Sequence, residues 1–214
     1  MDINSTEEQQ LETLKRWWME YGKSIILGAV IGLGGLFGWR YYQNYQIETR
    51  AAGADAFAQV SKQLASQGPA AFDETAAFVE QNQDNNYGEL AALLLAAEAV
   101  KANQLDLAQQ QLELALASTD DAALSDTIRL RLARVLLAQS QLADAQSYLD
   151  AITADAFTAQ RSEVQGDILM AEGKVDDARD AYRAARDAGG LNDNPGLQLK
   201  LDNLAVSAEL SDEE

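Results

Sequence analysis

The sequence predicts an all-α protein in which a single N-terminal transmembrane helix is followed by a solenoid of helical hairpins. Three observations predict it. One long apolar run without a charge lies near the N terminus, a short phrase recurs three times downstream, and the 214 residues include only two prolines. Ala, Leu, Gln, Asp and Glu dominate residues 44–210, and this composition favours helices separated by short turns over strands.

The apolar run predicts the membrane span. Sixteen uncharged residues extend from Ser24 to Trp39, and continuing the helix to Tyr42 gives a length of about 28 Å. A bilayer core is about 30 Å thick, and the flanking Lys23 and Arg40 can extend their charged ends to its surface. Trp and Tyr cluster at both borders, as in the aromatic belts of membrane helices. The alternative is a buried core helix.

Three glycines give the span a face of small residues. Gly28, Gly32 and Gly35 follow one another at i, i+4 and i+7, so they lie on one side of a helix. Small residues let a second membrane helix approach closely, and we predict that this face packs against another helix. The alternative is that glycine is simply frequent in membrane helices.

Basic residues beside the span predict its orientation. Lys15, Arg16 and Lys23 precede it, whereas only Arg40 and Arg50 follow it closely. The more basic end of a span stays in the cytoplasm, so we expect a cytoplasmic N terminus and an exported C-terminal domain. A cleavable signal peptide is the competing interpretation, but the 23 residues before the run are acidic overall, which favours an uncleaved anchor.

Composition argues against nucleic-acid binding and catalysis. Lys plus Arg number 16 and Asp plus Glu 34, the formal charge is −18, and His and Cys are absent. An acidic protein repels phosphate backbones, and without His or Cys there are no zinc sites, thiol nucleophiles or His-based proton transfer. We therefore expect no enzyme activity, no metal and no cofactor. Asp176, Asp177 and Asp180 alternate with Arg179 and Arg183, which predicts a solvated helix face.

A repeated phrase predicts three helical hairpins. Its copies begin at Asn103, Ser140 and Gly173, with spacings of 37 and 33 residues. Each copy has a small residue seven positions upstream, an Ala at its end and a large residue four positions after that Ala. These residues are Ala96, Ala133 and Gly166 upstream, Ala108, Ala145 and Ala178 at the end, and Leu112, Leu149 and Tyr182 after it.

This pattern resembles the tetratricopeptide repeat, whose two antiparallel helices pack through small residues while a large side chain fills the gap between neighbours. The third copy fits best. The first two have Asn103 and Ser140 in place of the turn glycine, and the closing proline is absent throughout. An irregular helical bundle is the alternative.

In such repeats the first helix of each hairpin lines the concave surface, so the resemblance predicts a groove for a partner or peptide. The inward positions are Leu93, Ala97 and Val100 in the first repeat, Leu130, Arg134 and Leu137 in the second, and Glu163, Asp167 and Met170 in the third. This groove is apolar early and acidic late, which suits an extended or helical peptide rather than an anion. Ordinary packing between helices is the alternative at each position.

The predicted organisation is a cytoplasmic N terminus at 1–23, a transmembrane helix at 24–42, a stalk with capping helices at 43–85, the repeat domain at 86–210 and an acidic tail at 211–214. Lys15-Arg16-Trp17-Trp18 and Tyr21-Gly22-Lys23 precede the span, and Gly38-Trp39-Arg40-Tyr41 ends it. With the repeats, this layout resembles the YfgM-type family of ancillary subunits of the bacterial SecYEG translocon.

The resemblance implies a single-pass inner-membrane protein with its domain in the periplasm. Its implied partners are the SecYEG translocon, a PpiD-like membrane-anchored chaperone and exported unfolded polypeptides. We therefore expect a membrane-tethered interaction module or co-chaperone. The alternative is a membrane-anchored regulator that sequesters a signalling protein.

Overall fold

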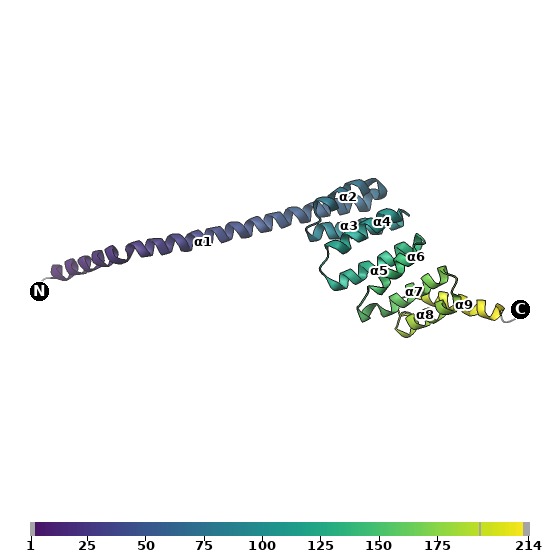
Figure 1. The fold of residues 1–214 in the computed structure, drawn as a ribbon. Helices are drawn as coiled ribbons and strands as arrows, with labels where there is room; N and C mark the ends of the chain where they lie inside the picture. The colour runs from purple at the N-terminus through teal and green to yellow at the C-terminus, as the bar shows by residue number, and fades with distance from the viewer. Residues whose placement is uncertain (1–2, 193, 212–214) are drawn as a thin grey trace. The chain divides into compact units, whose positions relative to one another are not determined.

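The fold was analysed in a computed structural model that describes residues 3–192 and 194–211. Within these ranges the secondary structure is helical, with no β-strand, which confirms the all-α prediction (Figure 1). The chain divides into two units, Met1–Asp55 and Ala56–Glu214. Of the acidic tail expected at 211–214, the last three residues lie outside the described ranges.

The first unit is formed by the N-terminal part of α1 (Ile3–Gln67). Within the described residues, one helical stretch, Leu11–Gln81, contains a window long and apolar enough to cross a membrane. Only 6% of that window is buried, whereas the core helix of a soluble protein would be mostly buried. The large apolar side chains of the run therefore face outward, as they do in a helix whose solvent is lipid.

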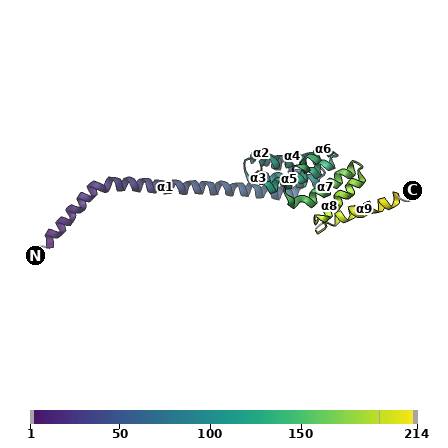
Figure 2. The ribbon, with the colours of Figure 1, turned by 60° about the horizontal axis from the view of Figure 1, so that its bottom comes forward.

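The second unit begins with the end of α1 and continues through short helices. Its further elements are η1 (Gly68–Ala71), α2 (Phe72–Gln81), α3 (Asn86–Lys101), α4 (Leu105–Ser118), α5 (Ala122–Ala138), α6 (Leu142–Asp150), η2 (Asp155–Phe157), α7 (Thr158–Ala171), α8 (Val175–Asp187) and α9 (Pro195–Ser211). α3 packs on α4, α5 on α6 and α7 on α8, so the three predicted hairpins are present (Figures 1 and 2). The alternative of an irregular bundle is wrong.

In all three hairpins the turn between the two helices contains a residue with a left-handed backbone conformation, at the first position of the repeated phrase. Asn103, Ser140 and Gly173 have φ of 56°, 62° and 79°, in the region that favours glycine. The following N–H closes each helix end: Gln104 N donates to Ala99 O at 2.8 Å, and the two later turns repeat this bond. The two hairpins without glycine thus make the same turn as the third.

Small residues allow the two helices of each hairpin to approach closely. Ala108, Ala145 and Ala178 are fully buried, and so are the large residues four positions later. The buried side chains form three clusters along the chain, one from the end of α1 to α5, one around α5 to α7 and one between α8 and α9. Each hairpin therefore packs on its neighbours, as in a solenoid.

A buried carboxylate ties the second hairpin to the third. Asp126 of α5 accepts hydrogen bonds from the backbone N–H of Thr153 (3.3 Å) and Ala154 (3.0 Å), in the link between α6 and η2. Arg129 Nη1 donates to the other carboxylate oxygen at 2.7 Å. These bonds fix where the third hairpin begins relative to α5.

Candidate functional site

The residues predicted to line the groove come from α3, α5 and α7, the first helices of the three hairpins. We call them the first-helix row. On α3 the row continues into an exposed apolar face. Leu90, Leu94 and Val100 are 44%, 41% and 45% exposed, and Ala97 lies exposed between them. Leu93 is half-buried against the first core cluster. The α3 part of the row therefore presents apolar surface to solvent.

On α5 the row divides between the core and the surface. Leu130 is 6% exposed and belongs to the second core cluster, and Leu137 is half-buried against the same cluster. Arg134 is exposed and makes no ion pair with any residue that the structure describes. The two leucines mainly hold helices together, whereas Arg134 is available to a partner.

On α7 the acidic positions of the row are occupied by a lysine from α9. Lys200 Nζ lies 2.8 Å from Glu163 Oε1 and 2.8 Å from the Asp167 carboxylate. Asn194 Nδ2 donates to the second oxygen of Glu163 at 2.8 Å, and Tyr182 Oη donates to Asp167 Oδ1 at 2.8 Å. The late part of the row carries the acidic residues that we expected, but their charge is paired within the chain.

The pKa shifts of this cluster follow from its partners. Burial alone raises the pKa of Glu163, but the bonds from Lys200 and Asn194 outweigh it, and the pKa is lowered. Burial disfavours the charged form of Lys200, yet the two carboxylates raise its pKa. Burial and the neighbouring Asp167 raise the pKa of Tyr182. All three groups are thus held in their ordinary charge states at neutral pH.

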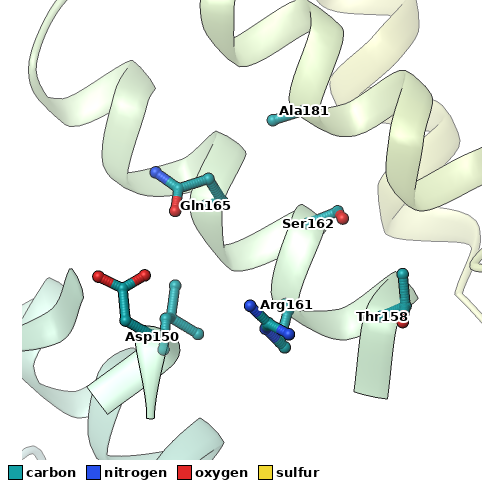
Figure 3. Close-up of a pocket in the computed structure, with 7 residues that line it drawn as sticks. Asp150, Thr158, Arg161, Ser162, Gln165 and Ala181 are labelled. Carbon is teal, nitrogen blue, oxygen red and sulfur yellow. The ribbon is translucent and has the colours of Figure 1, made fainter. Parts of the chain in front are cut away.

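A hollow of about 310 Å³ lies beside α7 (Figure 3). Arg161, Ser162 and Gln165 line it from α7, and Asp150 lines it from the end of α6. A second hollow, of about 340 Å³, includes Arg134, Gln160, Glu163 and Asn194 and therefore opens on the row itself. Of the two, only the second brings predicted row residues together. Met170, the last residue of the row, is exposed on α7.

Asp176, Asp180 and Arg183 of α8 are exposed, as expected of a solvated face, but Arg179 is only 19% exposed and donates through Nη2 to Leu204 O of α9 at 3.3 Å. Arg179 Nη1 pairs with Asp176 at 2.6 Å and Arg183 Nη1 with Asp180 at 3.3 Å. Within the described residues, no group of three or more His, Cys, Asp or Glu is placed to hold a metal ion.

The glycine face of the span has free space around it. A Cβ at Gly28, Gly32 or Gly35 would meet no other atom of the described chain within 4 Å. Nothing within this chain therefore uses the missing side chains, and close packing against a second helix stays a prediction.

Two residues that bind the acidic part of the row, Lys200 and Asn194, were not predicted from the sequence. Both belong to the C-terminal segment that follows the last repeated phrase, where no periodic signal predicts a contact with α7. A lone lysine in the α9 segment, downstream of acidic row positions, is the one sequence feature that suggests the pairing.

Comparison with known proteins places the chain in a family. The model of the tetratricopeptide repeat-like domain matches residues 15–206. The ancillary SecYEG translocon subunit of Escherichia coli (strain K12) is 33% identical over 96% of this chain and 100% of that protein. The protein of the same name from Haemophilus influenzae is 31% identical over 95% of the chain and 100% of its own length. The one from Aggregatibacter actinomycetemcomitans is 32% identical over 92% and 97%.

No solved structure matches the chain. The matches to these relatives run essentially from end to end, across both the apolar run and the hairpins, and the tetratricopeptide repeat-like model covers the same two regions. The chain belongs to the family of ancillary SecYEG translocon subunits, and its hairpin domain is tetratricopeptide repeat-like.

Proposed function

We propose that this chain is a single-pass inner-membrane protein that binds other proteins beside the Sec translocon. Residues 24–42 form its span, residues 1–23 lie in the cytoplasm, and residues 43–85 connect the span to a periplasmic repeat domain at 86–210. The basic residues before the span support this orientation. The name that its relatives carry supports the location at the translocon.

The observation that carries the proposal is the exposed apolar face of α3. Leu90, Leu94, Ala97 and Val100 follow one another at helical spacing, and none of them is buried by a neighbouring helix. An exposed contiguous apolar surface on a folded domain is typical of a protein-binding site. An extended or helical peptide fits it, because alternate or i, i+4 side chains can pack along such a face.

We further propose that the bound chains are exported polypeptides and that the domain acts with a PpiD-like membrane-anchored chaperone. A polypeptide that leaves a channel is unfolded and exposes apolar side chains. A binding face tethered next to the channel meets it at a raised effective concentration, so weak contacts suffice. This makes the protein a co-chaperone without a catalytic step.

Photocrosslinking in cells tests the proposal. A photoreactive amino acid replaces Leu94 or Val100 in the full-length protein, and a secreted protein is arrested during export. We expect crosslinks from both positions to the arrested chain. Gln110 on α4 is the matched control, because it is also exposed but lies outside the row. Equal crosslinking from Gln110, or none from the two α3 positions, would contradict the proposal.

The orientation has its own test. Protease added to spheroplasts should digest the repeat domain and leave a fragment that contains the span. Protection of the domain, under conditions in which an exported control protein is cleaved, would reverse the orientation.

A further inference from the structure

The part of α1 that precedes the span has one apolar face. Five large side chains, those of Leu11, Leu14, Trp17, Trp18 and Tyr21, are each between 46% and 60% exposed. At about 100° per residue these five positions fall within an arc of roughly 120° on the helix. The segment therefore has a continuous apolar stripe that no described part of the chain covers.

The opposite side of the same segment is charged. Glu12, Arg16, Glu20 and Lys23 occupy it, and Lys15 lies at its border with the apolar stripe. The exposed side chain of Met19 interrupts this face beside Glu12. Three basic residues thus accompany two carboxylates over 13 residues, whereas the chain as a whole has a formal charge of −18. The excess over these 13 residues is one charge, since the acidic residues before Leu11 make residues 1–23 acidic overall, and Lys15 is the cation that lies beside the stripe.

Aromatic rings complete the stripe. The ring centroids of Trp17 and Tyr21 are 6.1 Å apart. The Trp18 ring lies over Gly22, so close that a Cβ on that glycine would be 3.2 Å from it. Leu14, Trp17 and Trp18 of the stripe also line a mostly apolar hollow on the helix surface together with Lys15 and Met19. Trp and Tyr in such an arrangement are the side chains that prefer the boundary between headgroups and acyl chains.

The pattern changes at the start of the apolar run. From residue 24 to residue 39 the helix is apolar all around, with Ile31, Leu36 and Phe37 exposed on three different sides. A helix that is apolar on every side suits the bilayer interior, whereas a helix with one apolar and one charged face suits the bilayer surface. Figure 2 shows that α1 bends within its purple N-terminal part.

We propose that the segment from Leu11 to Tyr21 is an interfacial helix that lies along the cytoplasmic surface of the membrane and turns into the span near Gly22. Its partner is the lipid bilayer itself. The apolar stripe enters the acyl boundary, and Lys15, at the border of the stripe, contacts anionic headgroup phosphates, while Arg16 and the two carboxylates face the water. Lipid is the occupant because the stripe is continuous with the span. This inference rests on the proposed span at 24–42.

Depth-dependent fluorescence quenching in vesicles tests the inference. The full-length protein contains three Trp, which become Phe to give a silent background. One Trp is then placed at residue 11, 14 or 18, by Leu11→Trp, Leu14→Trp or retention of Trp18. Vesicles of phosphatidylethanolamine and phosphatidylglycerol carry lipids brominated at different depths. A helix along the surface places all three Trp at the same depth.

A helix that simply continues the span gives a different result. Depth would then change by about 1.5 Å per residue, which is roughly 10 Å between residues 11 and 18. Such a gradient would overturn the inference. Glu12→Trp and Glu20→Trp are the controls on the charged face, and we expect aqueous iodide, not the lipids, to quench them. Lipid quenching of these controls equal to that of the stripe would also overturn it.

Trp39 separates this inference from the proposed span. It lies at the far border of the apolar run and serves as the single Trp when residues 17 and 18 are Phe. Lipid quenching of Trp39 together with a depth gradient before the span means that only the interfacial helix is wrong. If lipid quenches neither Trp39 nor the stripe, both the span and the interfacial helix are wrong.

Discussion

Tyr182 lies against Gly166 so closely that no side chain fits between α7 and α8 at this point. A Cβ on residue 166 would be 3.0 Å from Tyr182 Cζ and would overlap two further ring atoms. The second hairpin has Ala133 and Leu149 at the corresponding positions. The third hairpin thus pairs the larger Tyr182 with glycine, whereas the second pairs the smaller Leu149 with alanine. In both hairpins the two helices can therefore pack closely.

The first prediction concerns this pair. Replacing a helical glycine by alanine ordinarily stabilises a helix by about 1 kcal/mol. Gly166→Ala should instead destabilise the domain by about 1–3 kcal/mol, because the added methyl group displaces the Tyr182 ring. Urea unfolding of the full-length protein in detergent, followed by circular dichroism, measures the change.

A double variant is the control for that prediction. Gly166→Ala with Tyr182→Leu recreates the pairing of the second hairpin and should lose less stability than the two single changes added together. A higher urea midpoint for Gly166→Ala alone would show that the Tyr182 ring can pack against residue 166 even when that residue has a Cβ.

The second prediction concerns the turn at Ser140. A residue with a Cβ in the left-handed region costs roughly 1–2 kcal/mol, and glycine avoids most of this cost. Ser140→Gly should therefore stabilise the protein by about 1 kcal/mol. Ser140→Ala is the matched control and should bring no gain, since alanine also has a Cβ. Equal thermal midpoints for the glycine variant and the unchanged protein would refute the prediction.

The third prediction concerns pH. Burial alone would raise the pKa of Asp126, but the N–H of Ala154, the guanidinium of Arg129 and the N–H of Thr153 outweigh it and lower the pKa. The unfolded chain then binds a proton more readily than the folded one. The stabilisation is complete above the unfolded pKa of about 3.9 and is lost as the pH falls through the folded pKa.

Asp126→Asn should therefore lower the free energy of unfolding by about 2 kcal/mol at pH 7, because it weakens hydrogen bonds made by a charged group. The difference between the variant and the unchanged protein should shrink as the pH falls from 5 toward 2. Thermal unfolding at a series of pH values measures it. A difference that stays constant over this range would show that the lower free energy of unfolding comes from altered side-chain packing and not from the lost carboxylate charge.

The hairpins could be predicted from sequence because their determinants are local. The spacing from Asn103 to Ala108 sets one turn and one close helix contact, and Ser140 to Ala145 repeats both. The positions of the first-helix row follow from the same periodicity. The residues that cover each position cannot be predicted in this way, because periodicity shows on which face of a helix a residue lies and not which other helix packs against that face.

The α7 part of the row illustrates this limit. Glu163 was expected on an open acidic surface, but Lys200, 37 residues downstream, forms an ion pair with it. Leu130 was expected in the groove and lies mostly in the core. Both outcomes depend on tertiary contacts between helices that are far apart in the sequence, and no repeated phrase marks the C-terminal helix.

The fourth prediction concerns this lysine. Lys200→Gln removes the cation between two carboxylates and should loosen α9 from α7. Because Lys200 is 32% exposed, we expect a loss of only about 1 kcal/mol. Amide hydrogen exchange should become faster in α9 and stay unchanged in α3. Lys174→Gln is the control, since its pair with Glu172 lies within one turn and holds no helix in place. Unchanged exchange in α9 would contradict the prediction.

The last prediction concerns the glycine face of the span. Changing Gly28, Gly32 and Gly35 together to Leu should weaken the association with a partner's membrane helix, because three side chains then block close approach. The chain itself offers no reason for a change in its own fold, since a Cβ at any of the three meets no described atom within 4 Å.

Gly34 and Gly38 supply the matched control for the glycine face. They are equally free of neighbours but lie off that face, so changing both to Leu adds two side chains of the same kind without blocking it. Affinity purification from solubilised membranes, at matched expression, compares the recovery of the translocon and of the proposed chaperone partner. We expect the unchanged protein and the control to recover these proteins equally and the triple variant to recover less. Because a contact through the repeat domain would remain and the two contacts reinforce each other through their linkage, the loss should be partial. Recovery by the triple variant equal to that of the control would show that the span only tethers the domain.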